Sequence, residues 1–127
     1  LTPWNSPLFI ASQCIAPALA AGNTIVLKPS EFTSISSLEF ATLAMEAGLP
    51  AGVINVVTGF GNPTGEALTS HPDVDKFCFV GGPATARRAM ANFAKNIKPS
   101  CLELGGKSPV MVFEDANLDN AANGVVK

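Results

Sequence analysis

The chain has 127 residues, of which 47% are hydrophobic and 14% charged, a composition that supports a folded core and excludes an intrinsically disordered protein. The net charge of -2 gives no electrostatic reason to expect nucleic acid or an anionic membrane as a partner. No run reaches the roughly 18 apolar residues of a membrane-spanning helix, so we expect no membrane association.

The three cysteines, Cys14, Cys78 and Cys101, lack the spacing of metal ligands. Each lies in an apolar segment, so we expect three buried, reduced thiols and no metal site. Reduced thiols indicate a reducing compartment, and we therefore expect a cytoplasmic protein.

Helical and strand-like patterns alternate from the N-terminus onward. A helix is expected at 7–21, where Asn5 or Ser6 can cap the start and Gly22 suits the C-terminal end. The continuous apolar run at 24–28 is typical of a parallel strand that is covered on both faces.

The same alternation continues to the C-terminus. Further helices are expected at 34–47, 63–70 and 84–95, and further strands at 53–57, 76–80, 100–104 and 110–113. An apolar stripe from Leu118 to Val126 predicts a last helix with no capping signal after it, which suggests a piece of a longer protein. Together these elements predict an α/β fold with an open parallel sheet, in one unit spanning residues 1–127.

Glycines, prolines and charged residues follow four of the expected strands. They form the segments 28–31, 58–61, 81–83 and 103–106. Open α/β sheets bind ligands at the carboxyl ends of their strands, so this coincidence indicates a nucleotide-like site.

Neither standard phosphate-binding loop is present. The segment GGKS at 105–108 lacks the earlier glycine of a P-loop, because Cys101 occupies that position. The segment GFGNPTG at 59–65 has Thr64 where the dinucleotide fingerprint needs its last glycine.

Three other features each have two interpretations. Gly81 and Gly82, placed before a helix, can form a plain turn or a phosphate site at the helix N-terminus. Lys28 and Glu31 can form a solvated ion pair or bind the hydroxyls of a sugar. Asn5 can be a helix cap or an amide that donates to an oxyanion.

Glu103 lies in an otherwise apolar, strand-like run, CLEL. Burying its charge is costly unless the carboxylate is paired or its altered acidity is used, which points to a functional role. By contrast, His71 is the only histidine and is expected in a surface turn, so nucleophilic catalysis built on histidine is unsupported.

Several segments together resemble, in order and spacing, the NAD(P)-binding domain of the aldehyde dehydrogenase superfamily. They are TPWNSPL, APALAAGNTIVLKPSE, EAGLPAGVINVVTGFG, SHPDVDKFCFVGG and LELGGKSP, and the resemblance covers nearly the whole chain. It implies a Rossmann-like fold with helices on both faces of the sheet. It also implies an enzyme in which a cysteine attacks an aldehyde, a hydride passes to NAD, and a water activated by a glutamate releases the acid.

The resemblance also implies roles for individual residues. Asn5 would stabilise the oxyanion, and Glu103 would be the general base, its burial tuning its pKa toward neutrality. Glu31 would bind the adenine-side ribose with Lys28 and repel a 2′-phosphate, so NAD is favoured over NADP. The implied cofactor-binding residues are Pro3, Trp4, Lys28, Ser30, Glu31, Gly61, Gly65, Phe79, Val80, Gly81, Gly82, Thr85, Leu104 and Gly105.

Three positions depart from the family's pattern. Gly82 and Pro83 stand where many members have hydroxyl residues, and Ala86 stands where a glycine is usual. We therefore expect a pyrophosphate to be held by backbone N–H groups and the helix dipole alone.

None of the three cysteines matches the position of the family's nucleophile, which lies beyond Lys127. We therefore expect this chain alone to be inactive, and the full-length protein to be a homo-oligomer that acts on a small-molecule aldehyde. Two alternatives stay open: a stand-alone nucleotide-binding module without chemistry, and a relative that forms acyl-CoA or reduces acyl phosphates.

Overall fold

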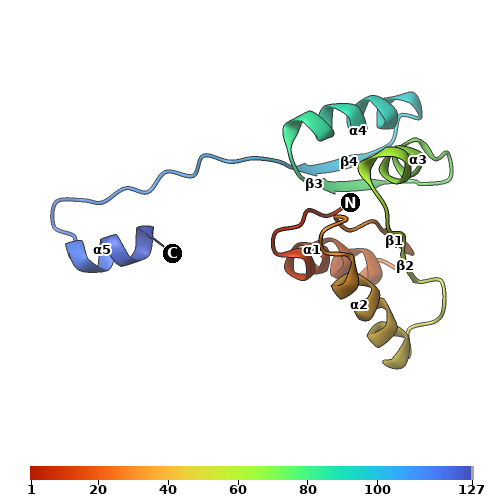
Figure 1. Cartoon of the computed structure of the whole chain (residues 1–127), viewed down its shortest axis with the longest axis horizontal. Coiled ribbons are helices and arrows are strands. Elements are labelled where there is room, and N and C mark those ends of the chain that lie inside the picture. Colours follow the sequence, from red (N-terminus) through yellow and green to blue (C-terminus); the bar gives the residue numbers. More distant parts are fainter. Residues whose placement is uncertain (127) are drawn as a thin grey trace.

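The computed structural model describes residues 1–126 and shows an α/β body from which a C-terminal segment extends (Figure 1). The helical elements are α1 (Pro7–Ala20), α2 (Ser34–Glu46), η1 (Gly61–Gly65), α3 (Glu66–Ser70), α4 (Pro83–Lys95) and α5 (Leu118–Val125). The strands are β1 (Ile25–Leu27), β2 (Ile54–Val56), β3 (Phe77–Val80) and β4 (Ser100–Glu103).

The strands form two parallel pairs. β1 pairs with β2, with Ile25 opposite Ile54, and β3 pairs with β4, with Cys78 opposite Cys101. Parallel strands need a crossover between them, and here α2 links β1 to β2 while α4 links β3 to β4.

The N-terminal segment joins the two pairs. The Val80 N–H donates to the Leu1 carbonyl at 3.1 Å on one side, and the Thr2 N–H donates to the Lys28 carbonyl at 3.1 Å on the other. The first residues therefore lie between β1 and β3, as Figure 1 also shows, and the order across the sheet is β2, β1, N-terminal segment, β3, β4. The predicted open parallel sheet is confirmed.

On one face of the sheet, α1 and α2 cover β1 and β2. Ala11 and Ile15 of α1 form a buried cluster with Leu27 of β1, and Phe40 of α2 packs against it. This burial of an apolar helix face is the main source of stability for short helices of this kind.

On the other face, α3 and α4 cover β3 and β4. The rings of Phe77 and Phe93 stack with centroids 4.2 Å apart and an interplanar angle of 15°. Phe77 and Phe79 point toward α4, whereas Cys78 between them points toward Cys14 of α1. Helices on both faces of the sheet are confirmed.

The ends of α1 follow the sequence signals only in part. At the C-terminus, Gly22 has the expected left-handed conformation, φ +77°, and the following Asn23 N–H donates to the Ala18 carbonyl at 3.0 Å. At the N-terminus, Ser6 occupies the cap position with φ 50° and its side chain makes no capping hydrogen bond. The expected side-chain cap is wrong, because a capping side chain needs the extended backbone that Ser6 does not adopt.

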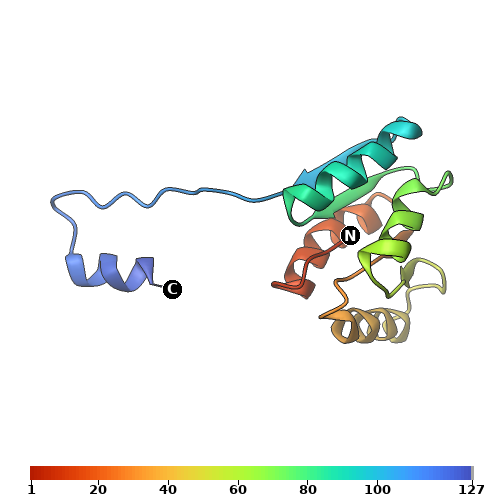
Figure 2. The same ribbon diagram turned by 45° about the horizontal axis from the view of Figure 1, so that its top comes forward.

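Residues 110–113 are not a strand, so that prediction is wrong. In both views the chain beyond β4 leaves the body, and α5 lies far from it (Figures 1 and 2). A strand needs a partner for its backbone groups, and the extended segment has no neighbour among the described residues. Its apolar side chains are consequently exposed, with Met111 at 74% and Phe113 at 70%.

The cysteines are less buried than expected. All three are free thiols, but Cys14 and Cys78 are half-buried and Cys101 is exposed. Cys101 lies on β4, the last strand of the sheet, which no further strand of the described chain covers. Within residues 1–126, no helix is both long and apolar enough to cross a membrane.

Candidate functional site

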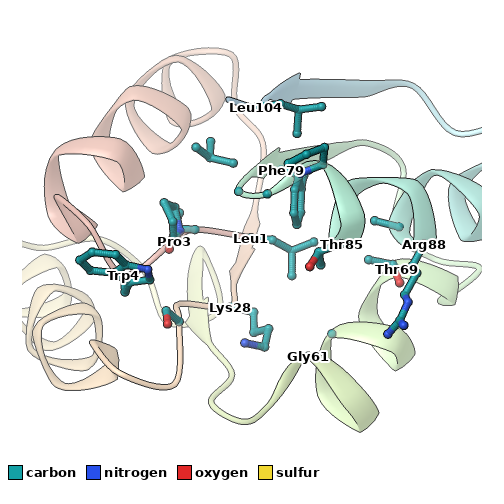
Figure 3. Close-up of a pocket in the computed structure, with 18 of the residues that line it drawn as sticks. Leu1, Pro3, Trp4, Lys28, Gly61, Thr69, Phe79, Thr85, Arg88 and Leu104 are labelled. Carbon is teal, nitrogen blue, oxygen red and sulfur yellow. The ribbon is translucent and has the colours of Figure 1, made fainter. Parts of the chain in front are cut away.

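A cavity of about 560 Å³ opens where the two halves of the sheet meet, at the carboxyl ends of β1, β3 and β4 (Figure 3). The sequence-predicted site residues all line it, although they come from five separate segments of the chain. They are Pro3, Trp4, Asn5, Lys28, Ser30, Glu31, Gly61, Gly65, Phe79, Val80, Gly81, Gly82, Thr85, Glu103, Leu104 and Gly105. The structure thus brings them together, while the role of each stays a prediction.

The segment after β1 supplies a buried cation. The Lys28 side chain is 6% exposed, and its Nζ donates to the Pro29 carbonyl at 2.9 Å. Burial lowers the pKa of Lys28, and the nearby Glu31 carboxylate partly opposes this shift. Glu31 itself is exposed, so the two charges face the cavity from the same short turn.

The segment after β2 approaches Lys28 closely. A Cβ placed on Gly65 would lie 3.8 Å from Cδ and Cε of Lys28, so the aliphatic part of the lysine side chain packs on this glycine. Gly59 is more constrained, because it has φ +140° and its Cβ would lie 2.1 Å from Oγ1 of Thr64. No residue other than glycine fits at position 59 without displacing Thr64.

The turn after β3 leads into α4. At Gly81 a Cβ would lie 2.9 Å from the Phe79 ring, so a side chain here would displace that ring. At Gly82, the N-cap of α4, a Cβ would meet nothing within 4 Å, and no side chain caps the helix. Backbone N–H groups in the first turn of α4 are therefore available to an anion, and a hydroxyl residue at Gly82 would meet no steric obstacle.

Asn5 is not the cap of α1, since Ser6 holds that position. Both Asn5 and Trp4 are exposed and line the cavity, so the interpretation of Asn5 as a helix cap is excluded. Its amide is free to donate to a ligand.

Glu103 is exposed, contrary to our expectation of a buried carboxylate. It ends β4, and within residues 1–126 nothing covers that edge of the sheet. Its position is nevertheless held by the backbone, because the Gly81 N–H donates to the Glu103 carbonyl at 3.1 Å. This hydrogen bond holds the backbone of Glu103 beside the glycine turn before α4.

The cavity has a polar end that was not predicted from the sequence. Asn92 of α4 is 3% exposed, and its Nδ2 donates to Oγ1 of Thr69 at 3.0 Å and to Oε1 of Glu66 at 3.2 Å. Arg88 extends toward Thr69 in Figure 3. The signal was available, because Thr85, Arg88 and Asn92 recur at helical spacing on one face of α4.

Two further predictions from the sequence concern histidine and metal. His71 is exposed in a turn, where its Nδ1 accepts from the Asp73 N–H at 3.2 Å, and the surface position expected for it is confirmed. Among residues 1–126, no group of three His, Cys, Asp or Glu side chains is placed to hold a metal ion.

Comparison with known proteins gives a consistent family assignment. Residues 1–127 match the aldehyde dehydrogenase family. The chain is 57% identical over 119 residues to "Betaine aldehyde dehydrogenase, chloroplastic" of Beta vulgaris, covering 94% of this chain and 24% of that protein. It is 52% identical over 126 residues to "Aminoaldehyde dehydrogenase 1, peroxisomal" of Pisum sativum, covering 99% of this chain and 25% of that protein.

Among solved structures, the chain resembles an NAD⁺ complex of aldehyde dehydrogenase from Bacillus cereus, with a TM-score of 0.92 and 50% identity. That match covers 97% of this chain and 25% of the other. The likeness confirms the Rossmann-like fold class. The chain spans about a quarter of the length of the curated relatives that it matches.

Proposed function

The chain belongs to the aldehyde dehydrogenase family, and from this premise we propose that it is the cofactor-binding part of an enzyme that oxidises an aldehyde to a carboxylic acid with NAD. The observation that carries the proposal is the cavity at the strand ends, which is lined by every residue for which the sequence implied a role. Ligands of open α/β sheets bind at this place.

The polar groups that line the cavity are suited to binding a dinucleotide. Thr2 is 8% exposed and its Oγ1 has no hydrogen-bond partner in the described chain, although it lines the cavity. A buried hydroxyl left unpaired is destabilising, so a ligand that reaches Thr2 would relieve a cost already present. Lys28 supplies a positive charge, and the first turn of α4 supplies N–H donors for a phosphate.

Glu31 supports the choice of NAD over NADP. Its carboxylate can accept hydrogen bonds from a ribose diol, and its negative charge opposes a 2′-phosphate at the same place. The carboxylate lies close enough to Lys28 to affect the pKa of that lysine, so both residues act on the same part of the cavity.

When bound, NAD would supply the hydride acceptor. Two residues of this chain have other tasks. Asn5 donates from its amide to an oxygen that becomes negatively charged. Glu103 accepts a proton from a water molecule, and the backbone hydrogen bond between Gly81 and Glu103 keeps this base at the rim of the cavity.

The nucleophile is not among the cysteines of this chain. Cys14, Cys78 and Cys101 do not line the cavity, so we propose that a cysteine elsewhere in the native protein attacks the aldehyde. The same observation favours the second candidate, a nucleotide-binding module without chemistry. The two candidates differ in a direct assay: only the first predicts aldehyde-dependent formation of NADH by the native protein.

The replacement Glu103→Gln tests the role of the base. Loss of a general base typically costs about 10²–10⁴-fold in rate, so turnover should fall by about that factor while the NAD dissociation constant changes little. Steady-state kinetics and NAD titration of the native protein measure both quantities. Unchanged turnover would remove Glu103 from the mechanism. If the native protein binds NAD but forms no NADH when aldehyde is added, the nucleotide-binding module is favoured.

Location and assembly are further parts of the proposal. We propose a cytoplasmic homo-oligomer, on the basis of the free thiols and the family membership. The names of the two plant relatives include the words chloroplastic and peroxisomal. Subcellular fractionation tests the location, and light scattering of the native protein tests the assembly.

A further inference from the structure

Three cysteines from distant parts of the sequence come together on α1, β3 and β4. Cys14 of α1 and Cys78 of β3 are 64 positions apart, yet their Sγ atoms lie 2.8 Å from each other in a thiol–thiol hydrogen bond. Cys101 stands opposite Cys78 in the parallel register. No step proposed for the site uses any of these sulfurs, and within residues 1–126 they do not form a metal-binding group.

We propose that Cys14 and Cys78 are a peroxide-sensitive dithiol that closes reversibly to a disulfide between α1 and β3. The two sulfurs already lie within about 1 Å of the ~2.0 Å bonding distance, so closure requires only a small movement. Both side chains are half-buried, which leaves a path for a small oxidant such as hydrogen peroxide. The inference does not depend on the proposed function.

The pair Cys14–Cys78 is favoured over Cys78–Cys101 by strand geometry. Directly opposite residues on neighbouring parallel strands have side chains that point the same way, about 4.8 Å apart. A disulfide needs its two Cβ atoms about 3.8 Å apart. Cys14 lies on a helix that packs on the sheet, so the fixed distance between neighbouring strands does not limit how closely it approaches Cys78.

The chemistry has two balanced steps. The Cys14 sulfur attacks one oxygen of hydrogen peroxide, which breaks the O–O bond and gives Cys14 sulfenic acid and one water. The Cys78 sulfur then attacks the Cys14 sulfur, and the hydroxide that leaves takes the Cys78 proton as a second water. Each thiol thereby loses one electron to the peroxide.

The order of the two cysteines follows from their surroundings. Burial is the main reason that the pKa of Cys78 is raised to about 11, and its hydrogen bond to Cys14 adds to the shift. The thiolate, which is the nucleophile, is therefore scarce at Cys78 near neutral pH. For that reason we assign the first oxidation to Cys14 and the resolving step to Cys78.

The disulfide would connect the two walls of the cavity. Trp4 and Asn5 lead into α1, and Phe79 to Gly82 follow Cys78 directly. A covalent bond between α1 and β3 would hold these segments at one separation.

Peptide mapping of the native protein tests the proposal. The protein is reduced, treated with hydrogen peroxide, blocked with N-ethylmaleimide, digested and analysed by mass spectrometry. We expect the Cys14 and Cys78 peptides joined, two hydrogen atoms lighter than their sum, and separate again after dithiothreitol. Cys101→Ser should keep this link, and Cys14→Ser should abolish it and leave Cys78 open to maleimide.

Two results would overturn the proposal. One is that Cys14 and Cys78 stay separately modified by maleimide after peroxide treatment. The other is that either of them is joined to Cys101 or to another cysteine instead. If Cys14→Ser does not fold, as judged by circular dichroism, the maps of the unaltered protein and of Cys101→Ser still decide the question.

Discussion

The turn that follows β2 allows a quantitative test of how the cavity is built, through the replacement Gly59→Ala. The backbone at Gly59 has φ +140°, and strain from such a conformation costs about 1–3 kcal/mol in a residue with a side chain. The new Cβ would also lie 2.1 Å from Oγ1 of Thr64, and overpacking of this kind costs about 1–3 kcal/mol. The turn from 59 to 65 should therefore lose about 2–6 kcal/mol of stability.

Hydrogen exchange at the Gly65 amide measures this loss, because that N–H donates to the Phe60 carbonyl at 3.2 Å across the turn. Gly61→Ala is the matched control, since its Cβ meets nothing within 4 Å, and we expect a change below about 0.5 kcal/mol. Adding Thr64→Ala to Gly59→Ala removes the nearest clashing atom and should restore part of the protection. Equal exchange rates in Gly59→Ala and Gly61→Ala would refute the reasoning.

Three other replacements test the core, a buried charge and cofactor choice. Phe93→Ala removes a ring that is 2% exposed and should lower the free energy of unfolding in urea by about 3–5 kcal/mol. Met90→Ala, on the exposed side of α4, should lower it by less than about 0.5 kcal/mol. Similar losses for both replacements would contradict the packing of Phe93 in the core. Burial lowers the pKa of Lys28, so between that lowered pKa and the ordinary value near 10.4 the unfolded state binds more protons than the folded state. The free energy of unfolding should therefore rise with pH across this window. Lys28→Met should flatten the corresponding rise in the urea midpoint. Glu31→Gln removes a negative charge that, at about 5 Å and an effective dielectric constant near 20, repels a phosphate charge by about 3 kcal/mol. The affinity for NADP should therefore rise about a hundredfold relative to that for NAD in binding titrations. An unchanged affinity ratio would show that the 2′-position does not lie near Glu31.

Local signals in the sequence predicted most elements of the body correctly. The conformations of Gly22 and Gly48, both with positive φ, follow from the need to end a helix without a Cβ in the way. β1 and β2 lie within their apolar runs, and α4 begins at the proline that suits a first turn. These features depend on a few neighbouring residues, which is why a single sequence reveals them.

Exposure and pairing were harder to predict, because they depend on what lies beside a segment. Residues 110–113 have the composition of a strand but no partner in the described chain, and Glu103 ends an edge strand that has no further strand beside it among residues 1–126. Ser6 has a good capping side chain in a backbone conformation that prevents capping. In each case the local sequence pattern is present, but the neighbouring elements or the backbone conformation determine the outcome.

The sequence by itself determined the family, the parallel α/β class and the set of residues that meet at the strand ends, because motif order and strand termini are local properties of the chain. Only the tertiary structure decided which groups touch one another there. It placed the first residues between β1 and β3, added Thr69, Arg88 and Asn92 to the cavity, and brought Cys14 within 2.8 Å of Cys78. The physical reason is that contacts between residues far apart in the chain arise from how helices pack on the two faces of the sheet, and no local pattern contains that information.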